Sequence, residues 1–269
     1  MNTCLVTFLY PKSRVFFKNF ISDVQKQRFK NFDIVFACDS IRPKIQINKK
    51  INYIYFKKTH ISEIRRLTIK KIIKMGYKKI IFTDVDDRFD INKLKVYSKL
   101  LNNNSIVFNE INIKKKNKIS IVNYFSNFFK KNTSINYQHI LENNFLGFTN
   151  TGIRADAFKK NMKFLNNSFY FPYDWFFYAN LLIFNKAFFT TETVTEYNCC
   201  RNSLTNLPPR VSKKYIDTCI EIKKNLYMAL NNKKKVYVML YKKILAFETC
   251  YKKKPSLKVK KKLKGWWDL

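Results

Sequence analysis

Three carboxylates follow a short apolar run near the middle of the chain. Residues 80–83 (Ile-Ile-Phe-Thr) lead directly into Asp84-Val85-Asp86-Asp87. Carboxylates this close repel one another unless a cation lies among them. Mg²⁺ and Mn²⁺ take carboxylate oxygen, and Mg²⁺ commonly shares its coordination shell with the phosphates of a substrate. The pattern therefore predicts a metal site for a phosphorylated ligand, and the simpler alternative is a solvated acidic turn.

A fourth acid stands beside a tryptophan in Tyr173-Asp174-Trp175, just before an aromatic stretch that predicts a helix over residues 175–184. A carboxylate that takes the proton from a hydroxyl nucleophile typically accelerates a reaction by roughly 10²–10⁴-fold. Asp174 can also be the N-cap of this helix, and both roles are compatible because a helix N-terminus stabilises a carboxylate. Trp175 has two interpretations, an acceptor-sugar platform or a core residue.

The elements that must position these acids alternate between strand and helix in the first half of the chain. The apolar spacing predicts strands over residues 5–10, 33–38, 51–56 and 79–83, and helices over residues 13–28 and 62–75, with Ser13 and Ser62 as N-caps and Gly76 after the second helix. This rhythm favours an α/β fold with a mostly parallel central sheet and flanking helices. Ligands bind at the carboxyl ends of such strands, where Asp39 and Asp84 are expected.

Over residues 5–207 the sequence resembles a family-2-type glycosyltransferase of the GT-A fold, of the kind that makes bacterial surface polysaccharides. The resemblance depends on the Gln-containing segment 24–34, on Asp39 after the second strand, on Asp84-Val85-Asp86 as a DxD motif, and on Tyr173-Asp174-Trp175. It implies a nucleotide-diphospho-sugar donor, a Mn²⁺ or Mg²⁺ ion, and direct attack that inverts the anomeric centre.

The resemblance also implies roles for individual residues. Asp174 is the catalytic base, and Asp86 with Asp84 holds the metal. Trp175 and Asn202 contact the acceptor. The residues expected at the nucleotide sugar are Phe8, Leu9, Asp39, Arg66 (with Arg65 as the alternative), Asp84, Val85 and Asn150, the last from its place in a glycine turn.

The segment Tyr197-Asn198-Cys199-Cys200-Arg201-Asn202 departs from the family pattern. The family often has Tyr-Arg-Gln-His followed by Asn, so that Cys200 stands where a metal- or diphosphate-contacting His is expected. Arg201 is available to supply positive charge instead. The third metal ligand is therefore open.

The chain of 269 residues carries 53 Lys and Arg against 18 Asp and Glu, a formal net charge of +35. Such a charge attracts polyanions, although only nine of these residues are Arg, and Arg is the residue that reads bases. No zinc-finger, helix-turn-helix or RNA-recognition signature is present, so a specific nucleic acid partner is not expected. Six scattered Cys without a CxxC motif and only two His argue against a zinc site or a Ser-His-Asp triad.

The composition changes at residue 211. Residues 211–269 contain 17 Lys against four acidic residues, keep helical apolar spacing, and close on Trp266-Trp267. Lysines and indole rings favour an anionic membrane surface, and the alternative is a helical packing appendage with a solvated face. We expect a GT-A catalytic domain over residues 1–210 and a basic helical appendage over residues 211–269. With no visible signal peptide or membrane span, the expected location is cytoplasmic, at the inner face of the cytoplasmic membrane.

Together these features predict a metal-dependent, inverting transferase that moves a sugar from a nucleotide-diphosphate donor to a hydroxyl of a glycan or lipid-linked acceptor. One alternative is a haloacid-dehalogenase-type phosphatase with Asp84 as nucleophile, which is disfavoured because Asp87-Arg88 replaces the usual Gly-Thr and the motif lies far from the N-terminus. The other alternative is a basic nucleic-acid-binding protein.

Overall fold

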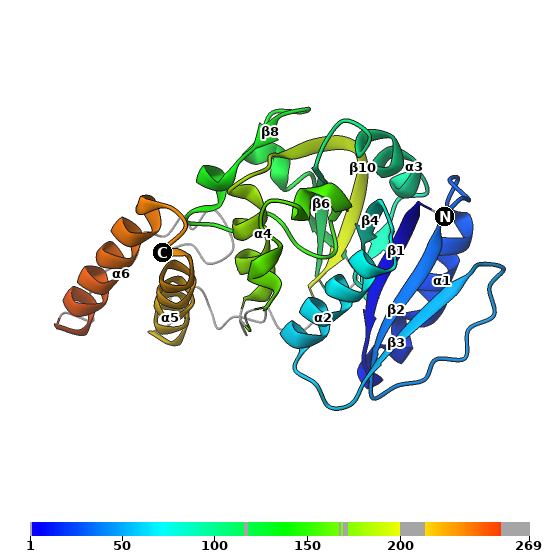
Figure 1. Ribbon diagram of the computed structural model, residues 1–269, viewed down its shortest axis with the longest axis horizontal. Coiled ribbons are helices and arrows are strands. Elements are labelled where there is room, and N and C mark those ends of the chain that lie inside the picture. The colour runs from blue at the N-terminus through cyan, green and yellow to red at the C-terminus, as the bar shows by residue number, and fades with distance from the viewer. Residues whose placement is uncertain (1, 116–117, 167, 169–171, 200–212, 254–269) are drawn as a thin grey trace.

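The computed structural model describes residues 2–115, 118–166, 168, 172–199 and 213–253. Cys200, Arg201, Asn202 and the Trp266-Trp267 pair lie outside the described residues. Within the described part, ten strands form one sheet with the path β3-β2-β1-β4-β9-β6-β10-β5, and β7 and β8 pair with β6 and β10 (Figure 1). This is the expected α/β class with a GT-A-like arrangement.

The first four strands of the sheet are parallel. They are β1 (Thr3–Leu9), β2 (Asp33–Asp39), β3 (Ile51–Phe56) and β4 (Lys79–Phe82). β1, β2 and β4 are buried on both faces, whereas the edge strand β3 is mostly half-buried and exposes Tyr55. β1 lies between β2 and β4, with Leu5 paired to Ile34 on one side and Ile81 on the other. Nearly continuous apolar runs are what a parallel strand covered on both faces requires. The predicted strand–helix alternation is confirmed here.

The second half of the sheet is mixed, which the strand–helix alternation did not predict. β9 (Thr151–Arg154) is antiparallel to both β4 and β6, while β6 (Ile106–Lys115) and β10 (Ala187–Asn198) are parallel. The remaining strands are short and antiparallel to their neighbours: β5 (Arg88–Phe89), β7 (Lys118–Ile121) and β8 (Ser134–Ile135). A four-residue strand such as β9 carries too little periodicity to show its direction.

Helices cover both faces of the sheet. They are α1 (Phe17–Lys26), α2 (Ile61–Lys74), α3 (Lys93–Leu100), α4 (Tyr173–Leu182), α5 (Lys213–Leu230) and α6 (Lys235–Lys253). Five 3₁₀ segments join them: η1 (Pro11–Phe16), η2 (Phe125–Asn127), η3 (Tyr137–Ile140), η4 (Ala155–Phe158) and η5 (Met162–Asn166). Because side chains alternate along β1, Val6 and Phe8 join a core with α2, α4 and α5, while Leu5 and Leu9 join a core with α1 and α3.

The start of α2 corrects one predicted cap. The N-cap is His60 rather than Ser62, and the His60 ring accepts a hydrogen bond from the Ser62 N–H at 3.3 Å. The predicted end is confirmed, because Gly76 follows α2 with a φ of +79°, a conformation that costs glycine nothing. α2 therefore begins two residues earlier than the serine signal indicates.

The two C-terminal helices pack together at the end of the molecule opposite α1 (Figure 1). Tyr215, Cys219 and Leu226 of α5 are buried in the same core as Trp175 of α4. The Tyr227 hydroxyl donates to the Leu141 carbonyl at 2.9 Å. The described helices include none that is both long and apolar enough to cross a membrane. α5 is therefore part of the core, and a domain boundary at residue 210 stays a prediction.

Gly152→Ala tests the close approach of α3 to β9. A Cβ at Gly152 would lie 2.5 Å from Cδ1 of Tyr97, a ring that is fully buried. Because overpacking of this kind typically costs about 1–3 kcal/mol, we expect the free energy of unfolding in a urea titration to fall by that amount. Lys159→Ala, at an exposed position, is the control and should leave it unchanged. An unchanged value for Gly152→Ala would contradict the packing described here.

Candidate active site

The turn after β4 separates the acidic cluster into half-buried members, Asp84 and Asp86, and a fully buried one, Asp87. Val85 is 2% exposed and belongs to the core, so it anchors the turn between its two acidic neighbours. The Asp84 side chain is 26% exposed, whereas Asp87 is 2% exposed. Burial raises the pKa of all three carboxyl groups, Asp84, Asp86 and Asp87. The repulsion expected from the sequence is therefore present in the fold.

Arg65 is the cation that faces this cluster. Its guanidinium lies 3.8 Å from Oδ1 of Asp84, and its Cζ lies over the Phe8 and Phe148 rings at 5.5 and 4.8 Å from their centroids. The Arg65 Nε is buried and has no hydrogen-bond partner among the described residues. A guanidinium packed over two neighbouring rings, with one donor still unpaired, is suited to an anionic ligand.

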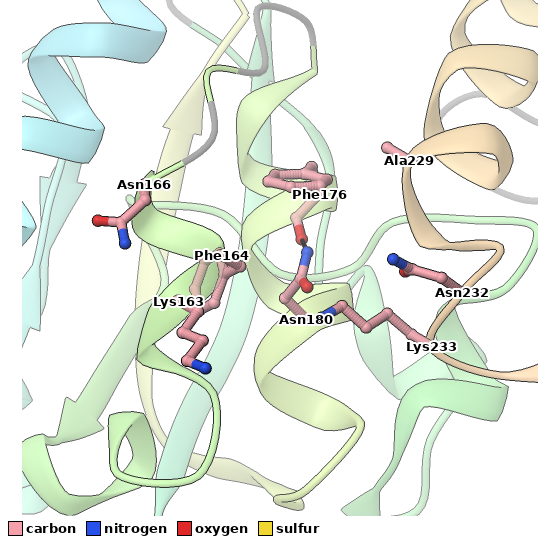
Figure 2. Close-up of a pocket in the computed structure, with 8 residues that line it drawn as sticks. All are labelled: Lys163, Phe164, Asn166, Phe176, Asn180, Ala229, Asn232 and Lys233. Carbon is pink, nitrogen blue, oxygen red and sulfur yellow. Dashed lines mark hydrogen bonds between the residues drawn. The ribbon is translucent and has the colours of Figure 1, made fainter.

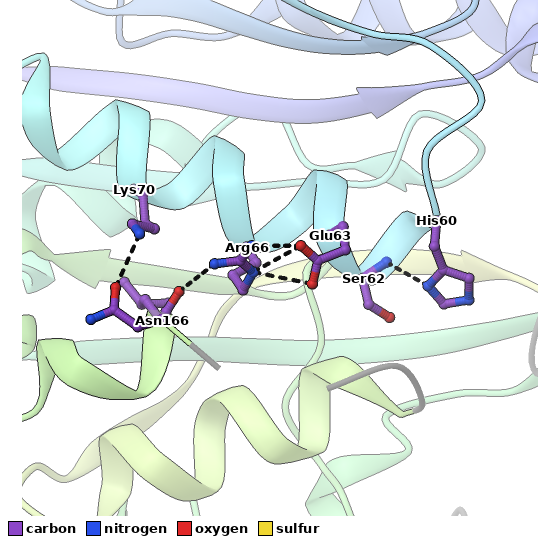
Figure 3. Close-up of polar contacts among 7 residues, drawn as sticks. His60, Ser62, Glu63, Arg66, Lys70 and Asn166 are labelled. Atoms are coloured by element: carbon purple, nitrogen blue, oxygen red, sulfur yellow. Dashed lines mark hydrogen bonds and ion pairs between the residues drawn. The ribbon is translucent and has the colours of Figure 1, made fainter. Parts of the chain in front are cut away.

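Arg66, the residue expected at the nucleotide, is paired with Glu63, and its contact with a nucleotide stays a prediction. It donates from Nε and Nη2 to the Glu63 carboxylate, and from Nη1 to the Leu165 carbonyl at 2.8 Å. Figure 3 shows Arg66 facing Glu63, next to the Lys70–Asn166 hydrogen bond. Successive residues of a helix point about 100° apart, so only one of two adjacent arginines reaches the acids.

Asp174 lies near Asp84, although 90 positions separate them in the sequence. It occupies the first turn of α4, whose N-cap is Pro172, so the predicted N-cap role of Asp174 is wrong. Its Oδ1 accepts a hydrogen bond from the Trp175 N–H at 2.8 Å. Burial raises the pKa of Asp174, the Asp84 charge raises it further, and the Arg65 charge opposes them. Asp84, Arg65 and Asp174 thus form one electrostatic group.

Asp87 belongs to a buried network that was not predicted. Its carboxylate accepts hydrogen bonds from the Thr149 hydroxyl and, at 2.7 Å, from the Asn198 N–H. Lys93, 0% exposed, donates from Nζ to the Thr149 carbonyl at 2.5 Å and to the Thr195 hydroxyl at 3.3 Å. Burial lowers the pKa of Lys93 to about 7, against the opposing charge of Asp87. These hydrogen bonds hold the acidic turn against β10 and against the loop before β9.

No pattern in the sequence distinguishes Lys93 from the many other lysines of the chain. Its burial becomes visible only when α3, β10 and the loop before β9 come together. Arg65, by contrast, could be identified from the sequence, because it was the alternative to Arg66 for contact with the nucleotide. Tyr178, whose hydroxyl contacts the Thr151 hydroxyl, was likewise not predicted.

The remaining residues expected at the nucleotide are at or near the predicted sheet edge, but most of their side chains are buried. Asp39 ends β2, is half-buried, and accepts hydrogen bonds from the Ser40 hydroxyl at 3.1 Å and the Thr59 N–H at 3.3 Å. Phe8, Leu9 and Val85 have core side chains, 3%, 1% and 2% exposed. Any contact of these three residues with a nucleotide would therefore involve their main-chain atoms, and it stays a prediction.

Two further expectations are corrected by burial. Trp175 is 0% exposed and its indole N–H donates to the Ile140 carbonyl at 2.7 Å, so it is a core residue and not a surface platform. Asn150 is 2% exposed, and its side chain accepts from the Gly147 N–H at 2.9 Å and donates to the Phe145 carbonyl. A Cβ at Gly147 would lie 3.4 Å from Oδ1 of Asn150 and 4.0 Å from Oδ2 of Asp174. Asn150 therefore shapes the loop beside Asp174.

The side chains near Asp84 and Asp86 are of a type that suits a divalent metal ion. Among the described residues, His, Cys, Asp and Glu side chains nowhere gather as a ready-made group of three metal ligands. Burial and the Asp84 charge raise the pKa of Asp86 to about 6, and Asp86 borders a hollow of about 120 Å³ shared with Lys114 and Asn198. Two carboxylates that repel each other offer hard oxygen ligands to a cation whose other positions water and phosphate can fill. Asp87, already hydrogen-bonded twice, is not needed for this set.

Comparison with solved structures shows the fold. S. aureus TarS 1–349 in complex with UDP-GlcNAc superposes with a TM-score of 0.65 at 14% identity, covering 97% of this chain and 77% of TarS 1–349. GalNAc-T7 with UDP, GalNAc and Mn²⁺ gives 0.58 at 9% identity, covering 86% of this chain and 48% of that one. No family model matches the sequence, and no curated protein matches it by sequence. The chain thus has the fold of GT-A glycosyltransferases.

The double substitution Asp87→Asn with Lys93→Met tests the buried network. Lys93→Met removes the buried cation near Asp87 and leaves the Thr149 carbonyl without its Lys93 donor, and a buried polar group left unpaired typically costs about 1–3 kcal/mol. We expect urea titrations to show that loss for Lys93→Met and a clearly smaller loss for the double variant, because Asn removes the uncompensated charge. If the losses in free energy of unfolding caused by Asp87→Asn and by Lys93→Met simply add up in the double variant, Asp87 and Lys93 are not coupled.

Asp86→Asn tests the raised pKa by its effect on stability. The folded pKa of about 6 lies above the unfolded value of about 3.9, so the folded state holds the proton more tightly and stability falls as the pH rises between these values. In EDTA, Asp86→Asn should therefore raise the Tm at pH 7.5 and have little effect at pH 4. Asp156→Asn, at an exposed position, is the control. If Asp86→Asn changes the Tm by the same amount at both pH values, the raised pKa of Asp86 is not the cause of the change.

Proposed function

We propose that the chain is a glycosyltransferase that moves a sugar from a nucleotide-diphosphate donor to a hydroxyl of an acceptor. The observation that carries the proposal is the group Asp84, Arg65 and Asp174 at the carboxyl end of the sheet in a GT-A fold. TarS with UDP-GlcNAc and GalNAc-T7 with UDP, GalNAc and Mn²⁺ support it, because both share the fold.

In this proposal the donor lies along the carboxyl ends of β1, β2 and β4. Asp39 contacts the base, Asp84 the ribose side, and Arg65 the diphosphate. Asp86 and Asp84 hold Mn²⁺ or Mg²⁺, which when bound supplies positive charge to the departing diphosphate. The Arg65 guanidinium, with its unpaired buried Nε, adds charge from the protein itself.

Asp174 acts as the general base. Its carboxylate takes the proton of the acceptor hydroxyl as that oxygen attacks the anomeric carbon from the face opposite the diphosphate, so the bond to the acceptor forms with inversion. Burial raises the pKa of Asp174, which makes it a stronger base than a solvated aspartate. The nearby Arg65 charge acts in the opposite direction and favours the ionised form that a general base requires.

The acceptor in this proposal is a glycan or a lipid-linked saccharide for surface polysaccharide synthesis. α6 exposes Val238 and Met239 together with Lys242 and Lys243, a combination that suits peripheral contact with an anionic membrane. Such a contact places the enzyme at the inner face of the cytoplasmic membrane, where lipid-linked acceptors are accessible.

Release of nucleoside diphosphate from UDP-GlcNAc or UDP-GalNAc in Mn²⁺ tests the proposal. We expect Asp86→Ala and Asp174→Asn each to lower the rate of transfer by about 10²-fold or more. Asp156→Asn, an exposed acid paired with Arg154, is the matched control and should retain the rate. Full activity of both site variants would refute the assignment, and release of phosphate from simple phosphate esters through Asp84 would favour a phosphatase.

A further inference from the structure

A hollow of about 340 Å³ lies where the sheet domain meets the C-terminal helices. Figure 2 shows that its walls come from η5, from α4 and from the end of α5 with the turn that follows. Phe176 and Asn180 are four residues apart and share a face of α4, whereas Asp174 points about 200° away from Phe176 around the helix. The hollow is therefore separate from the acidic group at Asp84 and Asp174.

The inner wall of the hollow combines aromatic and amide groups. The rings of Phe164 and Phe176 meet edge to face, 6.2 Å apart. Asn180 is 1% exposed; its amide donates to the Phe176 carbonyl at 2.9 Å and its side-chain oxygen accepts from Asn161 Nδ2 at 3.5 Å, which leaves one N–H and one lone pair of that oxygen with capacity for a ligand. Asn166, whose Oδ1 accepts from Lys70 Nζ at 3.0 Å, and Asn232 add amides to the lining. Apolar walls with a few polar groups are typical of small-ligand sites, and amides match the donor–acceptor pattern of sugar hydroxyls.

Two lysines give the hollow its charge. Lys163 enters from η5 and Lys233 from the turn after α5, on opposite sides of α4 (Figure 2). None of the lining residues is acidic, and in the described part of the chain neither lysine forms an ion pair. Both lysines are exposed, so their ammonium groups can reach a ligand from solvent. Two ammonium groups that line a hollow together with amides and aromatic rings fit a saccharide that carries a carboxylate or phosphate.

We propose that this hollow is a second saccharide-binding site, which holds an acidic sugar unit of the acceptor away from the reacting hydroxyl. The assignment of the bound sugar to the acceptor depends on the proposed function; the binding itself does not. The C-terminal helices then have a role in recognition, because Asn232 and Lys233 supply one wall.

Titration calorimetry of the full chain at 150 mM salt tests the proposal with three probes: a hexuronate-containing disaccharide, glucose 6-phosphate and neutral maltose. We expect at least one acidic probe to bind saturably and more tightly than maltose. Lys163→Met and Lys233→Met should each weaken that binding by about tenfold. The matched controls Lys160→Met and Lys235→Met remove the same charge from exposed neighbouring positions outside the hollow and should change it by less than about twofold.

The result also separates the two proposals. Saturable binding of an acidic probe by an unaltered chain that transfers no sugar from UDP-GlcNAc or UDP-GalNAc keeps the saccharide site and removes the glycosyltransferase assignment. Equal weakening by all four lysine variants, equal affinity for maltose, or no saturable binding of either acidic probe overturns the site. A preference between the hexuronate and the sugar phosphate identifies the acidic group.

Discussion

The arrangement of this protein depends on keeping four carboxylates close together in a largely buried place. Burial raises the pKa of Asp84, Asp86, Asp87 and Asp174, and the charges of neighbouring acids raise the pKa of the last three further. Two cations offset part of the free-energy cost of keeping these negative charges together, and they act from different sides of the cluster. Arg65 lies on the side of Asp84 and Asp174, and Lys93 is buried near Asp87. In the proposed function, a divalent cation on Asp84 and Asp86 would add positive charge among these acids.

The fold supplies this arrangement from elements that are distant in sequence. β1 contributes Phe8 and the loop before β9 contributes Phe148, and together their rings hold Arg65 of α2 against the end of β4. The same loop accepts hydrogen bonds from Lys93 and Tyr97, and its Gly147 lies beside Asp174. A displacement of this loop would therefore affect the donor acids and the base together.

The sequence predicted those features that local patterning controls. Apolar runs marked β1, β2 and β4, and the acids directly after β4 marked the sheet edge at which we propose that a ligand binds. It did not distinguish Arg65 from Arg66, because the direction of a helical side chain depends on how α2 is rotated against the sheet. Burial of Trp175 and Asn150, and the position of Lys93, depend on contacts with segments far away in the chain. A four-residue antiparallel strand such as β9 carries no local signal of its direction.

The most direct measurement is the affinity of UDP, in the presence of Mn²⁺, for Arg65→Met and Arg66→Met, two variants that remove the same charge from adjacent positions. Both must first be shown by thermal unfolding to be folded at the assay temperature. If Arg65 completes the anion site among the acids, Arg65→Met weakens UDP binding by about tenfold or more, while Arg66→Met binds as the unaltered chain does. Unchanged affinity of Arg65→Met, or an equal loss in both variants, would contradict the account.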